Sequence, residues 1–587
     1  MIAFDAPIPP KVADYLQYVL TDVGGLEHAN QIIASQCGIS RFFESDQELT
    51  LLKDLLAAEH NLVEESKRSE YRDFQTTYKL ACQVSDLLEQ NGAKPQLLIE
   101  PTCGKGSFVI ASLNAFPSLE MVVAVEIHKP YVWTCKFGVI EFFLSHPQMR
   151  KPIIRIEHHN VFEFDFGNVA RDNIEKQVLV IGNPPWVTNS KLSSLESDNL
   201  PPKSNFKRHA GLDAITGKGN FDIAEYITFM MLDAFQHSNG TFAFLVKDSV
   251  IRNVVANQKK RSYRVAELTK SAIDSKREFN VAVDASLFQC KLNSGPDMFC
   301  TEADFYHRNK TLKKFGWVGD HFVSDMQLYE ITSECDGESP FEWRQGLKHD
   351  LSSIMELQKT ESGFINGLGQ RVDIEDELVY PLVKSSDLRR VIIESTRKYV
   401  IVTQKHVGQD TSFLEQALPR TFNYLNQSRA QFKHRKSTIY RNRPDFSIFG
   451  IGDYSFSPYK VGVSGLYKQW QFSLVLPLGE KPVMLDDTCY MLGFDTLDFA
   501  AYAAIVLNSP VVREFLRSVS FQEAKRVITK ELLMRIDLLR VVTHYTPAYL
   551  LDELTKMNRM SSVTLNLDSW SAFLKAMKPA AAQIALF

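Results

Sequence analysis

The chain has 587 residues and a formal net charge of −4, with 44% hydrophobic and 23% charged residues. One hydrophobic core seldom supports this length, and the composition is that of ordinary globular proteins, so we expect two major domains. No apolar run approaches the length that spans a bilayer, and residues 1–10 lack a basic region followed by an apolar stretch. These features argue against a membrane protein and predict a cytoplasmic location.

Residues 1–70 show a mostly helical pattern and are predicted to form a helical extension. Its apolar positions include Leu49, Leu51, Leu52, Leu55 and Leu56. After it, Thr76 and Thr77 open an amphipathic stretch that runs to Leu88 and predicts a further helix.

A glycine-containing turn follows the strand-like run at residues 96–99. It reads Glu100, Pro101, Thr102, Cys103, Gly104, Lys105, Gly106, Ser107 and Phe108. Glycines at a strand-to-helix turn let the backbone approach a ligand closely. The third glycine of the dinucleotide fingerprint is absent at the usual spacing, and so is the phosphate loop, which favours a ligand without phosphates. Cys103 is interpreted as a small packing residue and not as a nucleophile.

The next strand-like run, at residues 122–125, ends on Glu126. In doubly wound folds a carboxylate at this place accepts hydrogen bonds from ribose hydroxyls. The alternative is an ordinary acid at the end of a strand that faces water.

Cysteine and histidine usage predicts reduced thiols and no metal site. The eight cysteines form no C-x-x-C pair; they stand at positions 37, 82, 103, 135, 290, 300, 335 and 489. His158 and His159 are adjacent, and adjacent side chains of a strand point to opposite faces, so they are poorly placed to chelate one ion.

The most informative motif is Asn183, Pro184, Pro185 and Trp186, which ends the apolar run at residues 178–182. The prolines fix the backbone, the Asn183 amide oxygen and the Pro184 carbonyl can accept hydrogen bonds, and Trp186 is expected to be exposed as a flat apolar wall. Such a pocket suits a planar group that carries an amine. The alternative is a simple Asn-Pro turn after a buried strand.

Residues 187–218 are rich in Ser, Asn, Pro, Lys and Gly and predict a mobile loop, either a lid over the site or an inert insertion. Residues 219–226 open a predicted helix, and residues 241–246 predict a strand that extends the sheet.

Positive charge is concentrated between residues 384 and 443, where 13 Lys or Arg residues stand against four acids, with interleaved aromatics. A net excess of nine charges on an acidic protein favours a polyanion, although a charge run is usually a solvated face. The candidate contacts, with a second cluster at 259–261 included, are Lys259, Lys260, Arg261, Lys433, Arg435, Lys436, Arg441 and Arg443. Lys525 and Arg526 are further candidates.

Residues 100–108, Glu126 and residues 183–186, in that order, resemble the S-adenosylmethionine motif, the ribose-binding acid and the catalytic motif of gamma-class DNA adenine-N6 methyltransferases. The likeness extends to the modification halves of type IIG restriction–modification proteins. It covers roughly residues 70–300 well and the rest more loosely. The same motif occurs in enzymes that methylate protein glutamine or ribosomal RNA guanine.

The resemblance implies four parts. Residues 1–70 would be the helical extension, 71–335 a Rossmann-like S-adenosylmethionine-dependent methyltransferase domain, 336–545 an α+β target-recognition domain, and 546–587 a C-terminal helical segment. The catalytic fold would be α/β with a mixed seven-stranded sheet.

The resemblance also assigns residues. The cofactor-binding set would be Thr76, Thr77, Glu100, Pro101, Cys103, Gly104, Gly106, Phe108, Glu126, Ile127, Asn160, Val161 and Asn183. Thr77 is equally well read as a helix cap. Asn160 stands where the family has an Asp, and its amide oxygen can accept the same hydrogen bond. Phe279 would stack on the base opposite Trp186, or else is a simple strand aromatic.

The implied reaction is base flipping in double-stranded DNA, followed by in-line attack of the adenine amine on the sulfonium methyl group, without a metal or a covalent intermediate. A partner restriction endonuclease would be a separate chain, because residues 1–70 are too short for the usual nuclease domain. Two alternatives stay open: a non-catalytic DNA-binding scaffold of a defence complex, and a methyltransferase acting on RNA or protein.

Overall fold

The computed structural model describes residues 6–57, 75–187, 222–307, 310–522 and 526–578. The chain divides into two compact units, Met1–Phe322 and Val323–Phe587, which are described separately below. The sequence placed the corresponding boundary at 335/336.

The first unit is built on a ten-stranded sheet with the order β10-β9-β8-β6-β7-β5-β4-β1-β2-β3. The seven strands from β6 to β3 in this order form the mixed sheet that was expected, with β7 antiparallel to both neighbours, which confirms the α/β methyltransferase-like class. Their bounds are β1 Leu97–Glu100, β2 Met121–Glu126, β3 Ile153–His158, β4 Val178–Gly182, β5 Gly240–Lys247, β6 Val265–Ile273 and β7 Ala285–Leu292. Three strands extend the sheet beyond the prediction: β8 Phe299–Asp304, β9 Thr311–Val318 and β10 His321–Val323.

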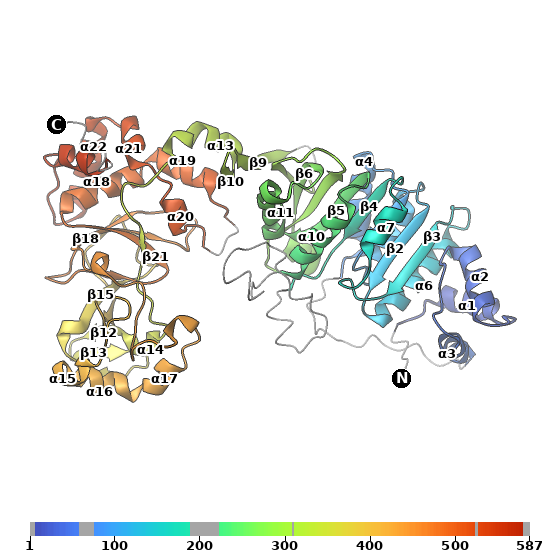
Figure 1. The fold of residues 1–587 in the computed structure, drawn as a ribbon, viewed down its shortest axis with the longest axis horizontal. Helices are drawn as coiled ribbons and strands as arrows, with labels where there is room; N and C mark the ends of the chain where they lie inside the picture. The colour runs from blue at the N-terminus through green and yellow to red at the C-terminus, as the bar shows by residue number, and fades with distance from the viewer. Residues whose placement is uncertain (1–5, 58–74, 188–221, 308–309, 523–525, 579–587) are drawn as a thin grey trace. The chain divides into compact units, whose positions relative to one another are not determined.

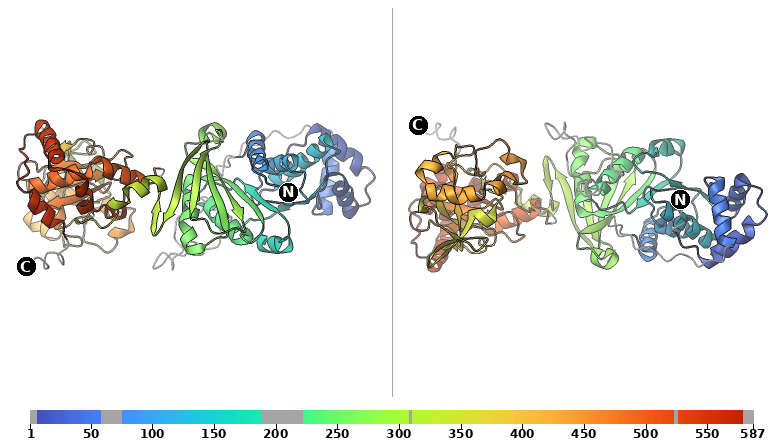
Figure 2. Two further views of the ribbon diagram at one scale, coloured as in Figure 1. Left: turned by 90° about the horizontal axis from the view of Figure 1, so that it is seen from above. Right: turned by 90° about the horizontal axis from the view of Figure 1, so that it is seen from below.

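Helices cover both faces of this sheet (Figure 2). One group of helices in mutual contact is α4 Tyr78–Gln90, α5 Ser107–Ala115 and α6 Lys129–Ser145, and another is α7 Phe166–Asp172, α10 Ile223–Phe235 and α11 Asp248–Arg261. Strands β1 and β4 are buried along their whole length, because parallel strands covered on both faces can be continuous apolar runs. A short helix, α12 Ser275–Phe279, precedes β7.

Strand β1 pairs in parallel with β2 on one side and with β4 on the other, where Leu97 lies opposite both Met121 and Val178. The strand order therefore reverses between β1 and β4. Open α/β sheets bind their ligands in the crevice at the carboxyl ends of strands at such a switch point.

The N-terminal helices α1 Pro10–Leu20, α2 Leu26–Cys37 and α3 Asp46–Ala57 belong to the first unit, where α1 and α2 contact α6 (Figure 1). The Phe42 ring packs edge-on against Trp133 at a centroid distance of 5.3 Å, and the buried Lys136 Nζ donates to the Phe42 carbonyl at 2.7 Å. The extension is therefore packed into the hydrophobic core of this unit.

The second unit contains two sheets, in keeping with the expected α+β class. The six-stranded sheet has the order β14-β13-β12-β17-β15-β20, with bounds β12 Glu356–Thr360, β13 Gly363–Asn366, β14 Arg371–Val372, β15 Val379–Val383, β17 Lys398–Ile401 and β20 Met484–Leu485. The five-stranded sheet has the order β11-β21-β18-β19-β16, with bounds β11 Arg344–Gln345, β16 Ile392–Ile393, β18 Tyr459–Ser464, β19 Ser473–Val475 and β21 Cys489–Phe494.

Helices of the second unit pack against both sheets. Helix α18 contacts β18, β19 and β21, and buried residues of α15 to α17 share a core with the six-stranded sheet. The helices are α13 Met326–Thr332, α14 Ser352–Met355, α15 Phe413–Ala417, α16 Pro419–Gln427, α17 Arg429–Lys433, α18 Leu497–Leu507, α19 Pro510–Val519, α20 Lys530–Leu533, α21 Leu538–Val541, α22 Pro547–Met560 and α23 Trp570–Ala576.

Within the described ranges, no single helix combines the length and apolar character needed to cross a membrane; α18 and α19 meet the test only as a pair bent by 60°. All eight cysteines are free thiols. No group of three or more His, Cys, Asp or Glu side chains suited to a metal ion occurs among the residues that the structure describes.

Candidate active site

A cavity with an empty volume of about 1080 Å³, which includes space open to solvent, lies at the carboxyl ends of β1, β2 and β4. The predicted residues that line it are Thr76, Glu100, Pro101, Cys103, Gly104, Phe108, Glu126, Ile127, Val161, Asn183, Pro184, Pro185 and Trp186. The structure thus brings three motifs distant in sequence to one cavity.

The glycine turn requires its glycines. Gly104 and Gly106 have φ values of 53° and 86°, which disfavour residues with a side chain. A Cβ at Gly106 would lie 2.4 Å from Cys135 Sγ, and one at Gly104 would lie 2.7 Å from Gln75 Oε1. The turn therefore leads into α5 with its backbone packed against neighbours, although Gly106 itself does not line the cavity.

Glu126 ties the end of β2 to this turn. Its Oε2 accepts a hydrogen bond from Gly104 N at 2.9 Å, and its Oε1 accepts one from His128 N at 2.8 Å. The side chain is buried and borders the cavity, so it does not face bulk water as the alternative interpretation had it. A carboxylate oxygen can accept further bonds, so Glu126 stays able to bind hydroxyl groups.

Two buried polar atoms in the wall of the cavity have no hydrogen-bond partner among the described residues, Glu100 Oε2 and Thr102 Oγ1. Burial raises the pKa of Glu100 well above its usual range, because desolvation disfavours its charged form. A buried polar atom without a partner is costly, so both atoms are suited to a polar ligand.

The Asn-Pro-Pro-Trp motif is anchored on both sides. Asn183 Nδ2 donates to Thr76 Oγ1 at 3.2 Å. The Trp186 carbonyl accepts from Lys247 Nζ at 3.0 Å, and this ammonium is also bonded to Asp222, the N-cap of α10. The loop backbone after β4 is thereby fixed to the end of β5 and the start of α10.

Trp186 is buried, not exposed as the sequence suggested. Its indole Nε1 donates to the Leu245 carbonyl at 3.2 Å, and its ring meets that of Phe279 edge to face at a centroid distance of 5.1 Å. Phe279 ends helix α12 and does not lie on a strand. Ring contact at this distance leaves no room for a base between the two rings as they stand.

A curated relative identifies the family. The type II methyltransferase M.NspV of Nostoc sp. is 38% identical to this chain over 483 residues, which cover 82% of this chain and 98% of the relative. This chain belongs to the type II methyltransferases. It is therefore a methyltransferase of the restriction–modification class, as the motifs indicated.

Solved structures agree with this family at the level of fold. The type IIL restriction–modification enzyme MmeI in complex with DNA has a TM-score of 0.52 at 12% identity, covering 86% of this chain and 74% of that chain. The type IIG restriction endonuclease BpuSI has a TM-score of 0.35 at 12% identity, too low to support an argument, over 96% of this chain and 76% of that chain. No protein-family model matches the chain.

Besides Gly106, three residues of this type II methyltransferase that were predicted to contact the cofactor or the base do not line the cavity. Thr77 Oγ1 accepts from Leu80 N at 3.3 Å and caps α4. Asn160 Oδ1 accepts from Phe162 N at 3.0 Å, which closes its own turn. Phe279 does not line the cavity but contacts the Trp186 ring, which does.

Several candidate DNA contacts of the methyltransferase are engaged within the protein. Arg261 binds Asp233 and the Tyr263 hydroxyl with only 8% of its side chain exposed, and Lys259 pairs with Asp320 over the Trp317 ring. Arg435 donates to three backbone carbonyls, those of Phe432, His349 and Ser447. The candidates that are exposed are Lys259, Lys260, Lys433, Lys436, Arg441 and Arg443, of which Lys259 is paired with Asp320.

The sequence missed Lys247 and Asp222 as supports of the catalytic motif. Asp222 immediately before a helical pattern is a recognisable N-cap, but its ion pair with Lys247 depends on the tertiary fold. The predicted loop at residues 187–218 lies outside the described residues apart from Val187, and so does Lys525.

Proposed function

We propose that this chain transfers a methyl group from S-adenosylmethionine to the N6 amine of an adenine in double-stranded DNA. One observation carries the proposal. Asn183 at the end of β4 shares a single cavity with the glycine turn after β1 and with Glu126 at the end of β2. Cofactor and amine would therefore meet at the switch point of the sheet.

The residues at the turn fit the cofactor. Glu126 would accept hydrogen bonds from the ribose hydroxyls, and Gly104, which leaves no room for a Cβ, brings the backbone of the turn to the cavity wall. Glu100 Oε2 and Thr102 Oγ1, which have no partner among the described residues, would meet polar atoms of the cofactor. When bound, S-adenosylmethionine supplies an electrophilic methyl group.

The catalytic motif fits an aromatic amine. The Asn183 amide oxygen and the Pro184 carbonyl would accept its two N–H groups and so favour tetrahedral geometry at nitrogen, which exposes the lone pair for in-line attack. The bond from Asn183 Nδ2 to Thr76 fixes the side chain for this role. A flipped base would stack on Trp186 after separating its ring from Phe279.

We further propose, from its membership of the type II methyltransferases, that the chain modifies one specific sequence in the cytoplasm and acts beside a separate restriction endonuclease.

The test is methyl transfer from tritiated S-adenosylmethionine to DNA, RNA and protein substrates, followed by digestion and identification of the methylated product. We expect label in N6-methyladenine of DNA alone. Asn183→Ala should lower turnover at least about 100-fold, as loss of a transition-state hydrogen bond does elsewhere, with cofactor affinity near normal. Asn168→Ala, which changes an exposed asparagine outside the cavity, is the control. Unchanged turnover of Asn183→Ala, or label in RNA or protein, contradicts the proposal.

A further inference from the structure

A second recess, with an empty volume of about 1500 Å³ including open solvent, lies entirely within the second unit. Segments distant in sequence line it: the stretch between β11 and β12, the end of β15, the region after α17, and the turn between β20 and β21. Unlike the active-site cavity, its wall is dominated by charged side chains, among them Lys348, Asp350, Glu356, Lys384 and Asp487.

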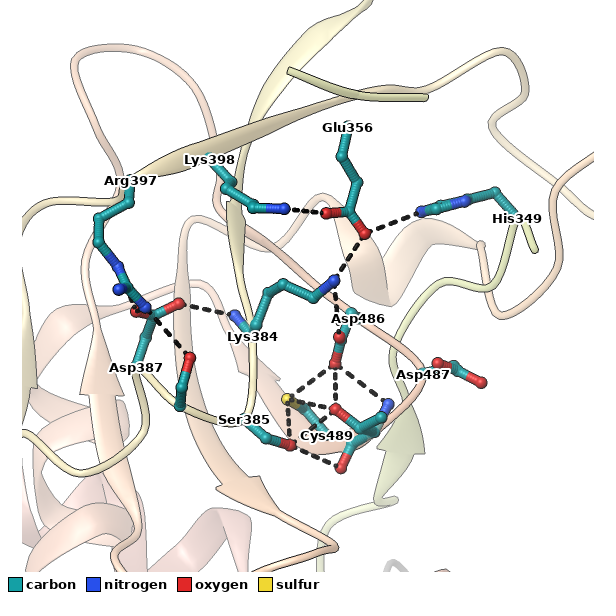
Figure 3. Close-up of polar contacts among 12 residues, drawn as sticks. His349, Glu356, Lys384, Ser385, Asp387, Arg397, Lys398, Asp486, Asp487 and Cys489 are labelled. Carbon is teal, nitrogen blue, oxygen red and sulfur yellow. Dashed lines mark hydrogen bonds and ion pairs between the residues drawn. The ribbon is translucent and has the colours of Figure 1, made fainter. Parts of the chain in front are cut away.

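Glu356 is a buried carboxylate at the centre of an ion network beside the recess, in which both lysines are partly exposed (Figure 3). Its two carboxylate oxygens each lie 2.6 Å from an ammonium group, that of Lys384 and that of Lys398. Lys384 also lies 3.7 Å from Asp486. The hydrogen bonds from the two lysines keep the pKa of Glu356 below its usual value although burial opposes this. These paired charges form a rigid side of the recess.

His349 completes this side as a neutral imidazole. Burial lowers its pKa to about 4, so the ring is uncharged at neutral pH. Its Nδ1 accepts from Leu351 N at 3.1 Å, which places the proton on Nε2. Nε2 is directed at Glu356, 3.7 Å from Oε1.

The turn from Asp486 to Cys489 is held by its own bonds. Asp486 Oδ1 accepts from Thr488 N at 3.1 Å and from Cys489 Sγ at 3.3 Å, and Ser385 Oγ lies 2.7 Å from Thr488 Oγ1. The backbone carbonyl of Asp487 accepts from Gln345 Nε2 and from Arg526. The main chain at Asp487 is therefore fixed before any ligand arrives.

The Asp487 carboxylate takes part in this scaffold through two long ion pairs and accepts no hydrogen bond from the described residues. Figure 3 shows it directed away from the Glu356 network. Lys348 Nζ lies 3.7 Å and Arg526 lies 3.9 Å from the carboxylate, both distances are longer than a hydrogen bond, and about 30% of the side chain is exposed. A fixed backbone thus presents a carboxylate that can accept hydrogen bonds within a recess.

The lining of the recess also contains basic residues. His434 and Lys436 follow α17 in the segment with the excess of positive charge, both are exposed, and both line the recess. Lys436 is suited to bind a phosphate. The Asp487 carboxylate repels phosphates, so it does not contribute to general affinity for a polyanion. Carboxylates in such a setting accept from exocyclic amines, above all cytosine N4. Adenine is a poorer fit, because its N7 acceptor beside N6 would repel the carboxylate.

We propose that this recess receives a base edge of double-stranded DNA in which Asp487 reads a cytosine amino group while Lys436 binds a backbone phosphate. The inference rests on the proposed function, since it assumes that DNA is the substrate. It names Asp487 as a specificity-determining residue, with Glu356, Lys384 and Asp486 as positioning residues.

The experiment compares the full chain with Asp487→Asn, Lys436→Ala and Asp552→Asn. Asp552 is the matched control, an exposed acid of α22 paired only with Lys556 among the recorded contacts and outside the recess. Each protein is given a randomised duplex library, and both the bound and the methylated sequences are read. Melting temperatures verify that each variant is folded.

We expect Asp487→Asn to reduce the preference for cytosine at one position roughly 5- to 150-fold, in line with the usual discrimination by a base contact. Lys436→Ala should weaken binding to all sequences alike. It should also reduce the slope of log affinity against log salt concentration by about 1. Asp552→Asn should match the parent chain.

Several results would overturn the inference: an unchanged sequence preference in folded Asp487→Asn, a uniform loss over all sequences, or a change at a position other than cytosine. Failure of the proposed function shows differently. If the parent chain binds DNA selectively but transfers no methyl group, the proposed reaction is wrong. The bound sequences then still test whether Asp487 recognises cytosine. If the parent chain selects no sequence, both are wrong.

Discussion

Lys247 is a residue outside the catalytic motif on which the geometry of the motif depends. Its ammonium joins the Trp186 carbonyl to Asp222, and Trp186 stands two residues after Pro184. We predict that Lys247→Met lowers kcat about 10- to 100-fold and changes the KM for DNA little, because misplacement near the reacting atoms costs rate more than binding. Steady-state kinetics measure this.

The control for this prediction is Lys291→Met, on the neighbouring antiparallel strand β7, where the lysine is exposed and lies 3.8 Å from Glu267. It should keep parental kinetics. Equal rates for Lys247→Met and the parent chain would show that the carbonyl needs no such support.

Two glycines with almost equal φ values differ in the space around them, so their alanine variants distinguish backbone strain from a side-chain clash. Gly106 (φ 86°) would place a Cβ 2.4 Å from Cys135 Sγ, whereas Gly92 (φ 88°) would place one in open space. Both alanine variants should lose about 1 kcal/mol of stability from the left-handed backbone. Gly106→Ala alone should also bind S-adenosylmethionine at least about tenfold more weakly, since the turn must shift. Calorimetric titration decides this, and equal affinities of the two variants would contradict it.

At the scale of elements, strand β18 contains an uncompensated lysine. Lys460 is fully buried, its Nζ donates to the Ser457 carbonyl, and desolvation lowers its pKa from 10.5 to about 7. Between pH 7 and 10.5 the unfolded chain therefore binds more protons than the folded chain, so the free energy of unfolding rises with pH across this window. Below pH 7 the burial cost is present in full.

We predict that Lys460→Met is more stable than the parent chain at pH 7, by about 1–2 kcal/mol, because a charge no longer has to be buried or neutralised. The difference should shrink as pH rises from 7 to 9. Lys468→Met, at an exposed position beyond the same strand, is the control and should show no pH-dependent difference. Urea unfolding at both pH values measures this; a destabilised Lys460→Met would mean that the carbonyl bond outweighs the buried charge.

Elements buried on both faces were predictable from sequence. The apolar runs at 96–99, 122–125, 178–182 and 241–246 appear as β1, β2, β4 and β5, because such strands need no alternation of polar residues. Strand β9 was missed, since four of its first five residues are at least partly exposed and two are lysines.

Side-chain environments were less predictable than elements. The burial of Trp186 depends on Leu245 and Phe279, which are far away in sequence. Charge counting likewise could not separate Arg435, whose guanidinium holds three backbone carbonyls, from its exposed neighbour Lys436. Sequence composition records how many charges are present, but the fold decides which of them are available to a partner.

For the whole molecule, the division at 322/323 suggests that the two units unfold separately, and the four-part division from sequence remains a proposal. We predict two calorimetric transitions. S-adenosylhomocysteine at about 100 times its Kd should raise the midpoint temperature of only one transition, because the cavity lies wholly in the first unit. The expected stabilisation of that unit is about 2.7 kcal/mol. Duplex DNA without cofactor is the complementary ligand and should shift the other. A single transition that shifts as a whole would contradict this prediction.

The edge-to-face contact between Trp186 and Phe279 means that no base fits between these two rings in the resting site. Such a pair is worth about 0.5–1.5 kcal/mol, which offsets part of the roughly 1–3 kcal/mol that one stacked base returns. A free nucleoside would therefore gain only the difference when it replaces one aromatic contact with another. Only a base delivered as part of a polymer, whose remaining contacts supply the binding energy, would open the pair, so the cellular pool of monomeric nucleosides should not compete for the enzyme.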